Sequence, residues 1–310
     1  MKHLANWRLA VKLILTLFLA CLCNLCPAQD TAKKTTMPLQ ELTGFSQAYY
    51  YSAGQEKRAH DIAEFMEGAV QYFQGETGFT PKTKMYILSP QNWKEFAAPA
   101  LENVYGFPHN IDHVRLAIAA EDNDFWKGYL PAVNQLPSNI AIQVTRAYRK
   151  PDSTYSMMPF FDLLALHELG HSYTSQAGLK MHRNWMGELF VNIMLHTYIA
   201  EKQPALLNAL TAFPNMVIAG GVSAYKYTSL QDFEKLYATM GMGPQNYGWY
   251  QCRLHAAAKD IYNAGGKKVL LQLWKALKKH QEIMTDEAFV RMLTDEVHPA
   301  VARVFLDWDK

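Results

Sequence analysis

Apolar residues recur at three- and four-residue steps in several parts of the chain, with charged residues between them. The first such segment, residues 55–74, places the following apolar residues on one side of a helix: Ile62, Phe65, Met66, Ala69, Val70 and Phe73. Gly75 and Gly78 follow, and glycine disfavours a helix interior. We therefore predict an amphipathic helix over residues 55–74.

Three shorter segments have the patterns of strands. Residues 85–88, Met-Tyr-Ile-Leu, form a short apolar run closed by Pro90. Residues 114–118 and 140–144 alternate between apolar and other side chains with a period of two. We predict a strand at each, and an edge at 114–118 or 140–144 could accept an extended substrate.

Beyond residue 158 the apolar period changes to that of helices. Pro159 is suited to a first helical turn. Helices are predicted at 160–173, 185–201, 230–240, 246–263, 267–280 and 286–308. The expected class is α+β, with a mixed α/β lobe over 29–180, a helical lobe over 181–310 and a cleft between them.

The first 28 residues have the layout of a secretory signal peptide. A basic start precedes an apolar run over residues 13–25, and Ala28 offers a cleavage site. A transmembrane anchor is the alternative, but the run is short for a bilayer. Lipidation at Cys21 is a second alternative. We expect an exported protein, periplasmic or secreted, in which residues 29–45 form a loose polar leader.

Charge and cysteine content exclude several kinds of partner and chemistry. A net charge of +2 argues against nucleic acid as the partner. Of the four cysteines, Cys252 alone lies beyond the predicted signal, so no intrachain disulfide is expected. Its apolar helical surroundings predict a small buried side chain rather than a nucleophile. No transmembrane segment is expected after signal removal.

Residues 167–171, His-Glu-Leu-Gly-His, carry the clearest chemical signal. On a helix, side chains four positions apart share a face, so His167 and His171 can bind one metal ion. Imidazole nitrogens suit Zn²⁺, and Glu168 can reach a zinc-bound water. We therefore predict a zinc site in which Glu168 is the general base.

A catalytic zinc site needs a third protein ligand. Glu188 is the only acidic residue between His171 and Glu201, and it lies in an apolar segment where an unpaired carboxylate would be costly. We predict Glu188 as the third ligand. His182 is a rival candidate and His196 a weaker one.

The two predicted helices resemble those of the gluzincin clan of zinc metallopeptidases, which includes thermolysin and the alanyl-aminopeptidase family. Those enzymes carry a Glu ligand on the helix after the H-E-x-x-H motif, and Glu188 follows His171 after 16 intervening residues. The resemblance implies a zincin-like catalytic domain with its zinc site in the cleft. It also implies that Asn192, one turn after Glu188, orients a zinc-binding histidine.

The aminopeptidase branch of this clan places an oxyanion-stabilising tyrosine some 60 residues beyond its Glu ligand. Tyr250 matches that position best, and Tyr247 is the reserve. The G-x-M-E-N segment of that branch does not precede Pro159 at the usual distance. The resemblance therefore implies a zinc peptidase without specifying an aminopeptidase.

The sequence thus predicts an exported Zn²⁺-dependent metallopeptidase whose partner is a peptide or protein substrate. Two other functions stay open. One is a zinc hydrolase of small amides or esters, and the other is a zincin-fold binding protein that has lost catalysis.

Overall fold

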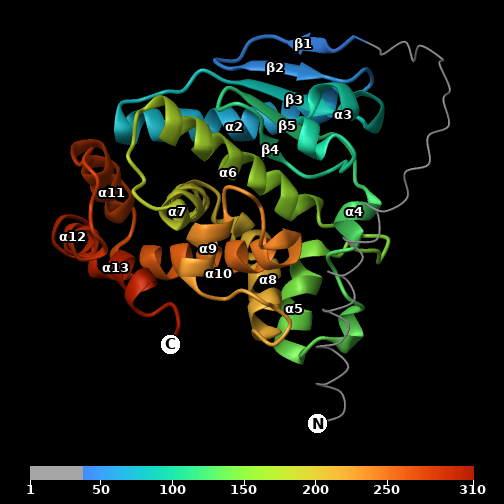
Figure 1. The fold of residues 1–310 in the computed structure, drawn as a ribbon. Helices are drawn as coiled ribbons and strands as arrows, with labels where there is room; N and C mark the ends of the chain where they lie inside the picture. The colour runs from blue at the N-terminus through green and yellow to red at the C-terminus, as the bar shows by residue number, and fades with distance from the viewer. Residues whose placement is uncertain (1–37) are drawn as a thin grey trace.

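The computed structural model describes residues 38–310 and has an α+β fold (Figure 1). The predicted signal peptide and Cys21 lie outside these residues. The elements, in chain order, are β1 (Gln40–Leu42), β2 (Ala48–Tyr51), α2 (Glu56–Thr77), β3 (Lys84–Leu88), α3 (Pro90–Phe96), η1 (Pro99–Leu101), β4 (His109–Asn110), β5 (Arg115–Ala119), α4 (Asp124–Lys127), η2 (Val133–Gln135), α5 (Ser138–Tyr148), α6 (Met158–Gln176), α7 (Asn184–Lys202), η3 (Pro204–Leu206), α8 (Leu207–Ala219), α9 (Leu230–Leu236), α10 (Gly243–Gly265), α11 (Lys268–Lys279), α12 (Asp286–Met292), η4 (Leu293–Val297) and α13 (Pro299–Leu306).

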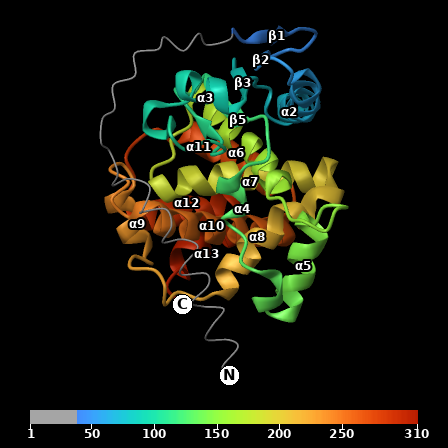
Figure 2. The same ribbon diagram turned by 90° about the vertical axis from the view of Figure 1, so that its right-hand side faces the viewer.

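One five-stranded sheet lies at one end of the molecule, and the helices from α7 onward lie away from it (Figures 1 and 2). Its strand order is β1-β2-β3-β5-β4. The three central strands are parallel, whereas β1 and β4 pair antiparallel at the two edges. Helices α2 and α6 contact each other and the sheet, so α6 is fixed beside the edge strand β4.

Several predicted elements are confirmed. The helix expected at 55–74 is α2, which ends where Gly78 adopts a left-handed φ of 71°. The strands expected at 85–88 and 114–118 are β3 and β5. The expectation of a loose leader over 29–45 is wrong for residues 40–42, which form β1 by pairing with β2.

The strand predicted at 140–144 is wrong, because these residues lie in helix α5. Ile140, Val144 and Tyr148 are buried at four-residue spacing, as on one face of a helix. In a strand, Ile142 would lie on the same side as Ile140 and Val144, but it is 64% exposed. The alternation of β-branched residues therefore imitated a strand pattern within a helix.

The single helix predicted over 286–308 is interrupted. Its first part is α12, which runs into the π-helical turn η4 before α13 begins at Pro299. Pro299 has no backbone N–H, and His298 before it has extended dihedrals of φ −167° and ψ 138°. Proline thus ends the first helix and opens the next.

The helices predicted at 160–173 and 185–201 are confirmed as α6 and α7, and those at 246–263 and 267–280 as α10 and α11. The helix predicted at 230–240 is confirmed as the shorter α9. Cys252 on α10 is a free, buried cysteine, as expected. Helix α7 packs against α6 on one side and α10 on another, and these three helices position the candidate site.

A buried carboxylate on α2 fastens the helix to the beginning of β2. Glu67 is 7% exposed and accepts hydrogen bonds from the backbone N–H groups of Ser46 and Gln47, at 3.1 and 2.9 Å, and from the Tyr49 hydroxyl, at 3.1 Å. Gln47 and Tyr49 are both buried. Their donors therefore depend on Glu67 rather than on water.

We expect Glu67→Ala to lower the free energy of unfolding by about 2–4 kcal/mol, because it leaves buried donors without an acceptor. Chemical denaturation followed by circular dichroism measures the loss. Glu64→Ala is the control, since Glu64 lies on the same helix with its side chain 65% exposed. A shift of the same size in both variants would contradict the anchoring role of Glu67.

Candidate metal site

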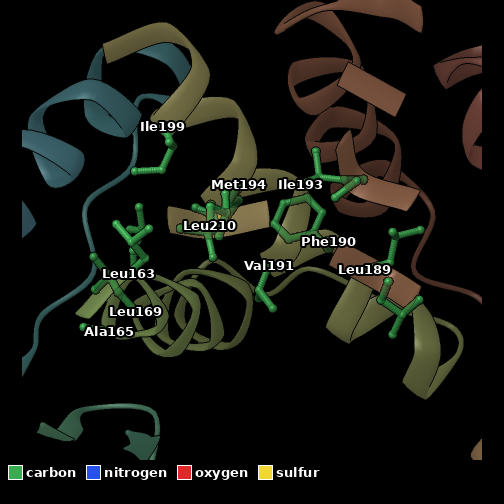
Figure 3. Packing of buried hydrophobic residues seen from close by; sticks show 14 of the residues in the cluster. Leu163, Ala165, Leu169, Leu189, Phe190, Val191, Ile193, Met194, Ile199 and Leu210 are labelled. Carbon is green, nitrogen blue, oxygen red and sulfur yellow. The ribbon is translucent and has the colours of Figure 1, made fainter. Parts of the chain in front are cut away.

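Three potential metal ligands come together where α6 packs against α7. His167 and His171 lie four residues apart on α6, and Glu188 lies on α7. The two helices approach closely because Gly170 lacks a side chain. A Cβ placed there would lie 2.8 Å from both Cβ and Cγ1 of Val191. Figure 3 shows the apolar packing of these helices around Leu169 and Val191.

The ligand atoms of the three side chains are directed at one another. The Nε2 atoms of His167 and His171 are 3.3 Å apart. Oε2 of Glu188 lies 3.2 Å from His167 Nε2 and 3.7 Å from His171 Nε2. This cluster could bind a metal ion, and within residues 38–310 no other group of three such side chains is arranged in this way. The rival ligands His182 and His196 are not part of it.

The cluster is largely buried, and burial and neighbouring groups shift the pKa of each of its three side chains. Glu188 is 1% exposed, and although burial disfavours its charged form, the nearby His171 and His167 lower the pKa of its carboxyl. Burial lowers the pKa of His171 to about 4. Burial acts in the same direction on His167, but its hydrogen bonds to Glu188 and Asn192 and the nearby charges of Glu168 and Glu188 together outweigh burial and raise the pKa of this imidazole. The site thus holds an ionised carboxylate beside imidazoles.

Both carboxylate oxygens of Glu188 have hydrogen-bond donors. The hydroxyl of Tyr237, the residue after α9, donates to Oε1 in a short hydrogen bond. The side-chain amide of Gln251 on α10 donates to Oε2 at 2.7 Å. In addition, His167 Nδ1 lies 3.0 Å from Asn192 Oδ1, the contact that the gluzincin resemblance implies. These partners hold the carboxylate and one imidazole in fixed orientations.

Glu168 lies beside the cluster without being part of it. Its Oε2 accepts a hydrogen bond from the backbone N–H of Asn110 at 2.8 Å. The Asn110 amide in turn donates to the backbone oxygen of Glu168 and to Ser172 Oγ, at 3.0 and 2.9 Å. Burial raises the pKa of Glu168 to about 7, against the opposing effect of His167. Strand β4 therefore orients the predicted general base.

The two candidate tyrosines on α10 have different surroundings. Tyr247 accepts a hydrogen bond from Gln251 Nε2 at 2.8 Å, the same nitrogen that donates to Glu188. Tyr250 is fully buried, and its hydroxyl donates to the backbone oxygen of Ser229 at 2.7 Å.

The surroundings of the two side chains favour Tyr247 over Tyr250 as the candidate oxyanion-stabilising residue. Side chains three positions apart on a helix differ in direction by only about 60°, so the contacts of each tyrosine, rather than the helix face, decide between them. Tyr250 packs against Phe233 and Trp308, and its hydroxyl donates to Ser229 rather than to a residue of the metal cluster. Tyr247, the reserve candidate, is the tyrosine of the two that reaches the surroundings of Glu188.

Sequence reasoning did not identify Asn110, Tyr237 or Gln251. Gln251 had a usable signal, because it lies four residues after Tyr247 and so shares its helix face. Asn110 and Tyr237 had no such sequence signal, since each lies in or beside a short element far along the chain from residues 167–171. Their proximity to Glu168 and Glu188 arises from the packing of β4 against α6 and of α9 against α7.

In residues 38–310 we find no helix that combines the length and the apolar character needed to cross a membrane.

Comparison with known proteins found no matching family model, no matching curated protein and no matching solved structure.

Proposed function

We propose that this protein is a zinc-dependent peptidase of the gluzincin type, with a zincin-like catalytic domain. The observation that carries the proposal is the convergence of His167, His171 and Glu188, with the carboxylate of Glu168 close enough to interact electrostatically with His167 and Glu188. Two imidazoles and one carboxylate, with a further acid that is not a ligand, form the donor set of a hydrolytic zinc site.

The spacing of the donor atoms fits a tetrahedral zinc ion. Tetrahedral zinc with ligands at about 2.0–2.1 Å separates neighbouring donor atoms by about 3.3 Å. The three donor pairs of this cluster are separated by 3.2, 3.3 and 3.7 Å. Three protein ligands would leave one tetrahedral position for water or substrate. Zinc bound here would polarise a substrate carbonyl and lower the pKa of water.

The remaining roles fall to side chains around the ligands. Glu168, oriented by the Asn110 N–H, would accept a proton from the attacking water and transfer it to the leaving amine. Tyr247 would donate its hydroxyl hydrogen to the carbonyl oxygen as negative charge develops there. Asn192 would keep His167 in the orientation that presents Nε2 to the metal.

A comparison of Glu168→Gln with the wild type tests this function. We expect the variant to keep one zinc per chain, measured by elemental analysis, and to lose hydrolysis of a peptide library by about 10²–10⁴-fold. Glu282→Gln, at an exposed position, is the control and is expected to behave as wild type. Undiminished hydrolysis by Glu168→Gln would refute the assignment of the general base.

The same assay separates the alternative functions. Wild-type protein that contains zinc but cleaves only small amides or esters would move the assignment to a hydrolase of those substrates. Zinc-loaded protein that cleaves neither class would favour a binding protein. Peptide cleavage that stops on removal of zinc with a chelator and returns on its addition would support the peptidase.

A further inference from the structure

Two side-chain amides connect a metal ligand to Tyr247 in one line of hydrogen bonds. His167 Nδ1 contacts Asn192 Oδ1 at 3.0 Å, and Asn192 Nδ2 donates to Gln251 Oε1 at 3.3 Å. Gln251 Nε2 then donates to Glu188 Oε2 and to the Tyr247 hydroxyl oxygen, at 2.7 and 2.8 Å. Asn192 is fully buried, so water does not compete for its amide.

Metal ligation through Nε2 of His167 would set the directions of the amide hydrogen bonds in this line. A histidine that binds metal through Nε2 carries its hydrogen on Nδ1, so Asn192 must present its oxygen to His167. The Asn192 nitrogen is then left to face Gln251, which must present its own oxygen in return. The orientation of the Gln251 amide therefore follows from that of the imidazole.

The nitrogen of Gln251 has two hydrogens, and both are used. One is donated to the Glu188 carboxylate, which can only accept, and the other to the oxygen of Tyr247. Tyr247 thus acts as an acceptor toward Gln251, and its own hydrogen must point elsewhere. Among residues 38–310, no side chain or backbone oxygen accepts that hydrogen.

We propose that Gln251 is a positioning residue that keeps the Tyr247 hydroxyl hydrogen available for a ligand of the metal site. It does so by occupying the space between the phenol and the nearest carboxylate. Without the amide, the Tyr247 hydrogen would be attracted to ionised Glu188, and the phenol would lose its role as a donor to substrate. This inference rests on the proposed zinc site and names the residue that prepares its oxyanion donor.

Ligand binding to the cobalt-substituted protein tests the inference separately from turnover. Acetohydroxamate is titrated at saturating cobalt and followed by the visible absorption of the metal. Gln251→Met and Tyr247→Phe are each expected to weaken binding by about tenfold, the loss of one hydrogen bond to a charged ligand. The double variant is expected to bind no more weakly than either single variant, because both changes remove the same donor.

The control is Gln272→Met, the same substitution at an exposed position on α11, which is expected to bind the probe as wild type. The inference would be overturned if the losses of acetohydroxamate affinity multiply in the double variant. It would also be overturned if Gln251→Met binds acetohydroxamate as tightly as the wild type. Protein that takes up no cobalt would refute both the inference and the proposed function. Cobalt uptake and the expected pattern of probe binding, without any peptide cleavage, would refute the peptidase alone.

Discussion

Glu188→Ala is expected to weaken zinc binding by more than about 100-fold. Loss of a hydrogen-bond partner of a metal ligand typically costs 10–100-fold in affinity, and this substitution removes a ligand itself. It also removes the carboxylate that His167 and His171 face at 3.2 and 3.7 Å. The remaining two imidazoles provide only two of the three protein ligands of a catalytic zinc site.

Competition with a chromogenic zinc chelator measures this affinity, and elemental analysis gives the metal content of the purified protein. Glu201→Ala is the matched control, since Glu201 lies on the same helix with an exposed side chain. We expect one zinc per chain in the wild type and in the control. Equal zinc affinity in Glu188→Ala and the wild type would remove Glu188 from the ligand set.

Gly170→Ala is expected to disturb both the fold and the metal site. The new methyl group would meet Cβ and Cγ1 of Val191 at 2.8 Å and its Cα at 3.4 Å. The backbone of α7 fixes the positions of Cα and Cβ of Val191, so a rotamer change cannot remove the contact and the helices must separate. Overpacking of this kind costs about 1–3 kcal/mol. Because Glu188 lies on the helix that is displaced, we also expect zinc affinity to fall at least about tenfold.

Gly248→Ala is the control for this substitution. Gly248 lies inside α10, and no atom lies within 4 Å of a Cβ placed there. The same chemical change is therefore expected to stabilise the protein by about 0.5–1 kcal/mol, because alanine favours helices over glycine. Denaturation midpoints and zinc affinities of the two variants are compared with the wild type. A stable, zinc-binding Gly170→Ala would show that α6 and α7 tolerate a wider separation.

The parts of the fold that sequence patterns predicted correctly are those with a strong local signal. Helix α2 has a continuous apolar face and a glycine end, and α6 and α7 lie in long apolar segments. The prediction was wrong where a local pattern of apolar residues was compatible with both a strand and a helix. Ile140 and Val144 fit both a strand and a helix, and burial of Tyr148 on the same face selected the helix.

Strand β1 shows a different limit. Residues 40–42 are exposed or half-buried and carry no apolar alternation, so nothing in their own sequence marks a strand. Their conformation is established by backbone hydrogen bonding to β2, antiparallel from Gln40 opposite Tyr51 to Leu42 opposite Tyr49. An edge strand of this kind is recognisable only when its partner is in place.

The amino-acid sequence was sufficient to identify His167 and His171 as a pair, because the four-residue spacing and the helical period lie within one segment. It also sufficed for Glu188, since an acid in an apolar helix needs a partner. The choice of Tyr247 over Tyr250 and the roles of Tyr237, Gln251 and Asn110 depend on contacts between distant segments. Asn192 and Gln251, for example, are 59 positions apart and meet because α7 packs against α10. Local periodicity is encoded in a few neighbouring residues, whereas such contacts depend on how all the helices pack, and therefore they emerge only in the folded chain.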